Sequence, residues 1–109
     1  MSTYSDTIYD VLNNLNVPKH VYGYKFMQYM LDDMCNNYKN HTIHKIGYYC
    51  NNVASKFNVT PRTVERTSRY FISKIDPNSE YYRKVFNITT KLSISKFTSY
   101  LVDYIMNTY

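Results

Sequence analysis

The fold is decided by the stretch VASKFNVTPRTVERTSRYFISKI, residues 53–75. Its pattern predicts two helices joined by a sharp turn. Asn58 tolerates the left-handed backbone conformation that ends a helix. Thr60 then offers a capping hydroxyl, and Pro61 suits the first turn of a new helix, where a missing N–H is not needed. We therefore predict a helix-turn-helix that spans about 47–76.

The second helix of this pair has two chemically different sides. At about 100° per residue, Val64, Phe71 and Ile75 fall on an apolar side that faces a core. The opposite stripe is polar and carries Arg62, Arg66, Arg69 and Ser73. A guanidinium group presents a planar fork of donors that fits the edge of guanine or a phosphate. This arrangement favours a DNA-reading helix over an ordinary solvated one.

The residues that we expect to contact DNA come from both helices and the turn: Lys56, Thr60, Arg62, Thr63, Glu65, Arg66, Arg69 and Ser73. Side chains on the second helix would reach base edges or adjacent phosphates, whereas Lys56 and Thr60 would hold the DNA backbone. Two alternatives stay open for Glu65. It accepts a hydrogen bond from a cytosine amino group, or it pairs with Arg69 one turn later and orients that guanidinium.

The rest of the chain has the apolar spacing of helices. Its 109 residues suit one domain, 1–109, and contain only two Gly and three Pro. Further helices are predicted at 5–15, 21–38, 80–86 and 93–106. The fold class is therefore all-α, a compact bundle of about six helices, although NITTKLSIS at 87–95 has the β-branched content of a strand. The expected buried residues are Val53, Ala54, Phe57, Val59, Val64, Phe71 and Leu101.

The charge of the chain is uneven along its length. The formal net charge is +5, and residues 1–40 hold four aspartates against three lysines, so residues 41–109 carry a net charge of +6. The predicted helix-turn-helix lies in this basic part, as binding to double-stranded DNA requires. No apolar run approaches the roughly 18 residues that span a bilayer, and no signal peptide is recognisable. We expect a cytoplasmic protein with no membrane association.

The sequence lacks the patterns of an enzyme or a metal site. It shows no catalytic triad, no glycine-rich phosphate loop and no clustered pair of carboxylates. Cys35 and Cys50 lie in separate predicted helices, without the close spacing of a zinc site. His41 and His44 flank a predicted loop, where we expect them to be solvated. We expect no catalytic activity, no metal and no cofactor.

Three stretches carry a resemblance to one protein family: NVPKHVYGY at 16–24, VASKFNVTPRTVER at 53–66 and SISKFTSYLVDYI at 93–105. Together they resemble the DNA-binding effector domain of the stage-zero sporulation protein A, a response regulator of endospore-forming bacteria. The resemblance implies a six-helix domain that reads a short G/C-containing box in the major groove, usually as tandem copies. By position, Glu65, Arg66 and Arg69 match the reading-helix residues of that family.

The chain departs from this family at several points. Thr63 stands where the family has a base-reading arginine, and Arg62 lies one position earlier, so the preferred box should differ. The segment from Pro77 to Ser93 is shorter than the corresponding segment of the family. The family attaches this domain to a phosphorylatable receiver domain, whereas we expect a stand-alone effector domain here. We expect a sequence-specific regulator of transcription; the alternative is a protein–protein module that binds a full-length regulator or RNA polymerase without reading DNA.

Overall fold

The structure, a computed structural model, describes residues 4–17, 23–42 and 44–108. These residues form six helices and no strand: α1 (Ser5–Asn14), α2 (Gly23–Lys39), α3 (Ile46–Phe57), α4 (Pro61–Ser73), α5 (Glu80–Phe86) and α6 (Ile94–Thr108). The all-α fold is thus confirmed. The strand-like segment that begins at Asn87 is a loop until α6 begins. The expected start of the second helix at Val21 falls outside the described residues.

The helix ends follow the chemistry of the residues at them. Asn58 closes α3 in the left-handed region, with φ 56° and ψ 48°, and Asn87 closes α5 in the same way. The Thr60 hydroxyl accepts a hydrogen bond from the Thr63 amide at 3.1 Å, so it caps α4. Ser79 caps α5 by accepting from the Tyr82 amide at 3.2 Å. Each side-chain cap satisfies a backbone donor that the helix itself leaves unpaired.

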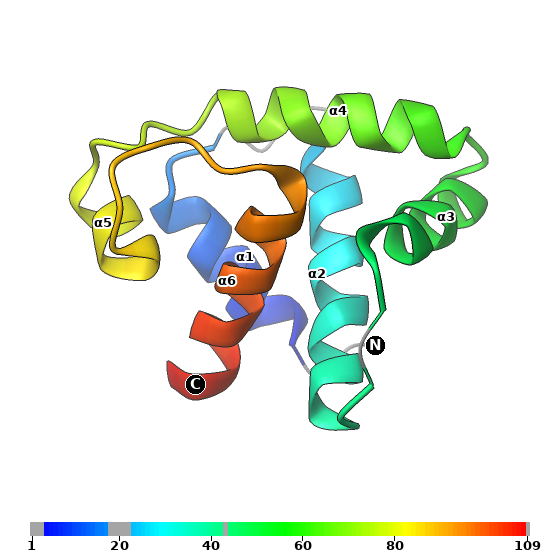
Figure 1. Cartoon of the computed structure of the whole chain (residues 1–109), viewed down its shortest axis with the longest axis horizontal. Helices are drawn as coiled ribbons and strands as arrows, with labels where there is room; N and C mark the ends of the chain where they lie inside the picture. Colours follow the sequence, from blue (N-terminus) through cyan, green and yellow to red (C-terminus); the bar gives the residue numbers. More distant parts are fainter. Residues whose placement is uncertain (1–3, 18–22, 43, 109) are drawn as a thin grey trace.

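The helices pack around α2, and α4 lies across one end of the bundle. In Figure 1, α4 lies across the top of the molecule, and α2 and α6 descend beneath it. α2 packs against α1, α3, α4 and α6, and is the central helix. Gly23 allows α2 to approach α4 closely, because an added Cβ there would lie 3.0 Å from the Phe71 Cβ and 3.0 Å from the Thr67 carbonyl oxygen.

The core contains most of the residues that the sequence assigns to it. Those confirmed as buried are Val53, Ala54, Val64, Phe71 and Leu101. The prediction is wrong for Phe57 and Val59, which are only half-buried at the edge of the core. Phe57 ends α3, and its ring lies between those of Phe26, 5.1 Å away, and Tyr29, 6.0 Å away. The position of Phe57 at a helix end therefore leaves one side of its ring uncovered.

The two cysteines are free thiols inside this core. Cys35 is completely buried in α2, and Cys50 is buried in α3. Burial raises the pKa of Cys35 from 9.0 to about 12, with a further contribution from the nearby Asp32 carboxylate. Burial also raises the pKa of Cys50. Both thiols therefore stay protonated at neutral pH.

Candidate nucleic-acid interface

The turn between α3 and α4 fixes where the second helix begins. The Thr60 and Thr63 hydroxyl oxygens are 2.9 Å apart and share a hydrogen bond, in addition to the cap that Thr60 provides. Thr63 is half-buried and Thr60 is exposed. Two of the expected DNA contacts are therefore already part of the capping structure, which leaves each hydroxyl with less free hydrogen-bonding capacity.

The outer side of α4 carries two arginines that are free to bind a ligand. Arg62 and Arg66 are exposed and, within the described part of the chain, make no ion pair and no side-chain hydrogen bond. They lie on the side of the helix turned away from the buried Val64 and Phe71. Packing of the apolar side against the core thus directs both guanidinium groups outward.

Two further side chains, one on α4 and one on the residue that follows it, were not singled out from the sequence. Tyr70 is 54% exposed, and it follows Arg66 by one helical turn. The Lys74 ammonium lies 4.8 Å from the centre of the Tyr70 ring, a cation–π contact. The i, i+4 spacing of Arg66, Tyr70 and Lys74 is the signal that could have identified them. They extend the outer side of α4 toward its C-terminal end.

Arg69 and Glu65 lie on a flank of α4. They form an ion pair, with Nη2 of Arg69 2.5 Å from Oε1 of Glu65, while the Arg69 side chain stays 67% exposed. Of the two alternatives for Glu65, the structure adopts the i, i+4 pair. Ser73 ends the predicted stripe, and its hydroxyl donates to the Tyr70 carbonyl oxygen at 2.6 Å. These three residues are thus engaged within α4, unlike Arg62 and Arg66.

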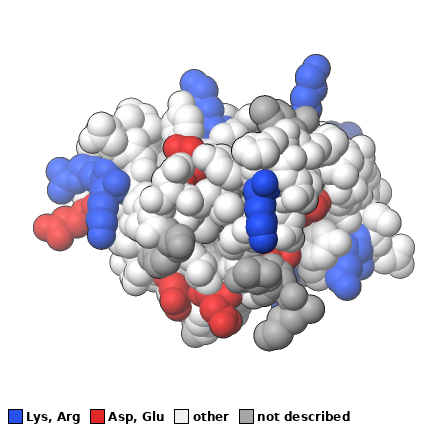
Figure 2. Space-filling model, turned by 90° about the horizontal axis from the view of Figure 1, so that it is seen from below, with Lys and Arg blue, Asp and Glu red and all other residues white. Residues whose placement is uncertain are grey.

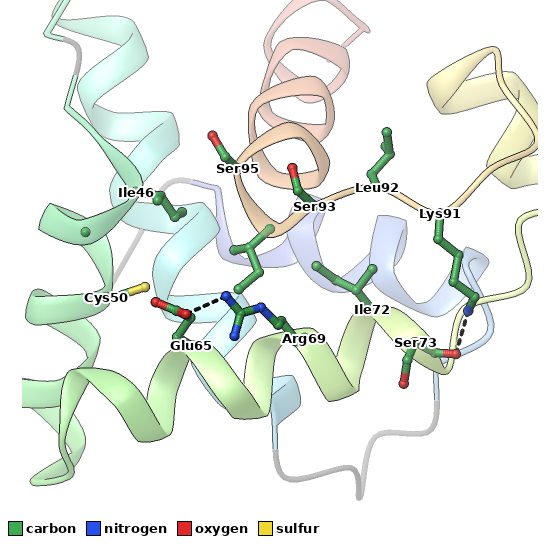
Figure 3. Close-up of a pocket in the computed structure, with 12 residues that line it drawn as sticks. Ile46, Cys50, Glu65, Arg69, Ile72, Ser73, Lys91, Leu92, Ser93 and Ser95 are labelled. Carbon is green, nitrogen blue, oxygen red and sulfur yellow. Dashed lines mark hydrogen bonds and ion pairs between the residues drawn. The ribbon is translucent and has the colours of Figure 1, made fainter.

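A groove of about 390 Å³ runs beside this flank (Figure 3). Glu65, Arg69 and Ser73 line it from α4, and Ile46 and Cys50 line it from α3. The wall opposite is the segment 91–95, whose last two residues begin α6. This groove could not be predicted from the sequence, because its walls meet only in the folded chain.

Lys56 is exposed, as expected, but it has a neighbour on the central helix. Its ammonium lies 6.0 Å from the centre of the Tyr29 ring on α2. This contact is long and exposed, so it leaves the ammonium able to meet a phosphate.

The opposite face of the molecule has a different charge pattern. Figure 2 shows the molecule from below, with α4 on the far side: Lys and Arg side chains are spread over this face, most of them singly, and Asp and Glu side chains are also present on it. On α4, by contrast, three arginines fall within eight residues with Glu65 as the single acid. Along α4 the cations therefore outnumber the acidic side chains.

The structure also shows whether side chains that could bind a metal lie close together. No group of three or more His, Cys, Asp or Glu side chains in the described ranges could hold a metal ion. His41 is exposed, as expected, whereas His44 is half-buried and stacks on Tyr48 with 3.8 Å between ring centres.

Among the described residues, none of the helices has both the length and the apolar character needed to cross a membrane.

Comparison with known proteins agrees with this geometry. The model of the family described as "Sporulation initiation factor Spo0A C terminal" matches residues 8–108. A comparison with curated proteins gave no significant match. The family is one of DNA-binding effector domains and not a family of enzymes. Because the match covers most of α1 and all of α2 to α6, the chain belongs to the Spo0A C-terminal family of DNA-binding transcription regulators.

Proposed function

We propose that this protein regulates transcription by reading a short DNA box in the major groove with the outer side of α4. The observation that carries the proposal is the pair of exposed arginines, Arg62 and Arg66, which have no partner among the described residues and lie on the side of α4 opposite its buried residues. A major groove of B-DNA admits one α-helix, and an arginine at its floor binds guanine through two hydrogen bonds.

The roles of the site residues follow from their positions. Arg66, at the middle of the outer side, reads a base edge. Arg62 and Thr63 lie in the first turn of α4 and reach a base or an adjacent phosphate. Arg69 is oriented by its ion pair with Glu65. From the flank of α4 it also reaches a base or an adjacent phosphate. Contacts to the DNA backbone come from Thr60, Lys56 and the end of α4 at Ser73.

The experiment is selection of bound sequences from a random duplex pool, followed by titration of the selected duplex and a scrambled duplex of equal composition. We expect the selected duplex to bind at least about 10³-fold more tightly at physiological salt, with protection of one box or of two tandem boxes in a footprint. Equal binding of both duplexes would reject base reading. Absence of any footprint, with retention on RNA polymerase or on a full-length regulator, would establish the protein–protein alternative.

A further inference from the structure

The C-terminal end of α4 is closed differently from those of α3 and α5. Those two helices end in an asparagine in the left-handed region, Asn58 and Asn87. α4 ends instead at Lys74 in the right-handed region, with φ −85° and ψ −7°. Its last turn contains no basic side chain. The Tyr70, Phe71 and Ile72 carbonyl oxygens accept from the Ser73 hydroxyl and from the Lys74 and Ile75 amides. The Ser73 carbonyl group needs a donor from outside the helix.

Lys91 supplies that donor from the segment before α6. Its ammonium donates to the Ser73 carbonyl oxygen at 2.6 Å and to the Ile75 carbonyl oxygen at 3.0 Å. Figure 3 shows the Lys91 side chain reaching across to the end of α4. The positive charge also complements the negative end of the helix dipole. We call this contact the Lys91 clasp.

The residues around Lys91 are themselves anchored in the core. The Tyr82 hydroxyl on α5 donates to the carbonyl oxygen of Thr90, the preceding residue, at 2.7 Å. Tyr82 is only 1% exposed, so Thr90 is fixed to the buried side of α5. On the other side, Ile94 is buried at the start of α6. The Lys91 clasp thus joins the end of α4 to a segment that α5 and α6 hold.

We propose that Lys91 is a positioning residue for DNA reading, which it serves by fixing the direction of α4. This inference rests on the proposed function. The Thr60 cap holds the first turn of α4, and the Lys91 clasp holds its last turn. A helix held at both ends presents Arg66 at a constant angle to the groove. Base readout depends on such placement, because two parallel hydrogen bonds tolerate displacements of only about 0.5 Å.

Three variants separate this role from a simple effect of charge. Lys91→Met keeps most of the side-chain length but removes the donor. Lys91→Arg keeps the charge and donors that can reach both carbonyl groups. Lys96→Met is the matched control, because Lys96 is an exposed lysine of the first turn of α6, and its ammonium makes no hydrogen bond or ion pair among the described residues. Each variant is titrated with the selected and the scrambled duplex at several salt concentrations.

We expect Lys91→Met to reduce the ratio of selected to scrambled affinity about fivefold to tenfold. Lys96→Met should leave that ratio unchanged, and Lys91→Arg should restore it. An unchanged ratio in Lys91→Met would overturn the inference. So would an equal loss on both duplexes with a log–log salt slope reduced by about 1, since that result identifies a phosphate contact.

Amide hydrogen exchange on the DNA-free protein gives an independent readout. The amides of Lys74 and Ile75, which donate to the Phe71 and Ile72 carbonyl oxygens, should exchange faster in Lys91→Met and not in Lys96→Met. Unchanged exchange at both amides would show that Lys91 does not hold the end of α4. If the unaltered protein failed to distinguish the two duplexes, the proposed function would be wrong. Faster exchange in Lys91→Met would then show that Lys91 stabilises the end of α4 without a role in DNA reading.

Discussion

Arg66 and Arg69 are three residues apart on α4 and have the same side chain, yet their surroundings differ. Arg69 is paired with Glu65 beside the groove, whereas Arg66 is exposed and has no partner among the described residues. A guanidinium that is already paired must give up or share that partner when it meets DNA. An unpaired one loses only water, so Arg66 is the stronger candidate for base reading.

Replacing Arg66 by Ala should therefore cost about 1–3 kcal/mol on the selected duplex and little on a scrambled one. Lys56→Ala is the contrasting variant, because Lys56 is placed to meet phosphates only. It should weaken both duplexes equally and reduce the log–log salt slope by roughly 1. Both are measured by titration at several salt concentrations. An equal loss on both duplexes for Arg66→Ala would make Arg66 a phosphate contact.

A carboxylate on α2 should lower the stability of the protein at neutral pH. Asp32 is half-buried, and its Oδ1 atom is buried without a hydrogen-bond partner in the described structure. Burial raises the pKa of Asp32 above 3.8, and the neighbouring Asp33 charge raises it further. A folded-state pKa above the unfolded value means that the folded protein favours the protonated carboxyl. The stability that protonation provides is full at pH values below the unfolded pKa and is lost as pH rises through the folded pKa.

Asp32→Asn should consequently raise the free energy of unfolding by about 1 kcal/mol at pH 7. The gain should disappear below about pH 3, where the native aspartate is protonated in both states. Urea denaturation at the two pH values measures the difference. Asp10→Asn, which alters an exposed carboxylate on α1, serves as the control and should give a smaller change. A gain for Asp32→Asn that persists at low pH would rule out the charge as its cause.

At the level of the helices, the sequence predicted starts better than ends. Thr60 and Pro61 mark the start of α4 by local chemistry, and so does Ser79 for α5. The helix-turn-helix was expected to run to about residue 76, whereas α4 ends at Ser73. The Lys91 ammonium donates to the Ser73 and Ile75 carbonyl oxygens at this end, and a contact 18 residues away leaves no trace in local periodicity.

The site shows the same division between local and distant contacts. The Glu65–Arg69 pair could be predicted because both residues lie one turn apart on one helix. The groove and the contact of Lys56 with Tyr29 could not. The groove depends on how α3, α4 and the segment before α6 meet, and the Lys56 contact depends on how α3 packs against α2. The spacing of residues within one element does not determine either geometry.

The two glycines should respond in opposite ways to alanine. A Cβ at Gly23 would press on the Phe71 Cβ and on the Thr67 backbone, each at 3.0 Å, and backbone cannot swing aside as a flexible side chain can. Gly23→Ala should lower the free energy of unfolding by about 1–3 kcal/mol. Gly47 lies in the first turn of α3 with nothing within 4 Å of an added Cβ. Gly47→Ala should be neutral or stabilising by up to about 1 kcal/mol.

Thermal melting of the two variants tests this contrast. Because Gly23 packs against α4, Gly23→Ala should also weaken binding to the selected duplex, whereas Gly47→Ala should not. If both variants melted alike, the close approach of α2 and α4 would not be a determinant of the fold.

For the molecule as a whole, stability should depend on Phe71 more than on Phe57. Phe71 is completely buried and lies 6.0 Å from the Tyr24 ring. Phe71→Ala should cost about 3–5 kcal/mol, which is comparable to the entire stability of a small domain. Phe57 is half-buried, so Phe57→Ala should cost roughly 1–2 kcal/mol. Urea denaturation measures both, and equal losses would show that the edge of α3 is as tightly packed as the centre of the bundle.

The burial of both thiols has a practical consequence for spectroscopy. Because Cys35 and Cys50 are covered and protonated at neutral pH, a maleimide reagent should leave them unmodified in the folded protein. Tyr100→Cys, at an exposed position of α6 outside the proposed DNA contacts, would then accept a fluorophore at a single defined position. Energy transfer from that dye to one on the end of a duplex would report the orientation in which the protein lies on its DNA.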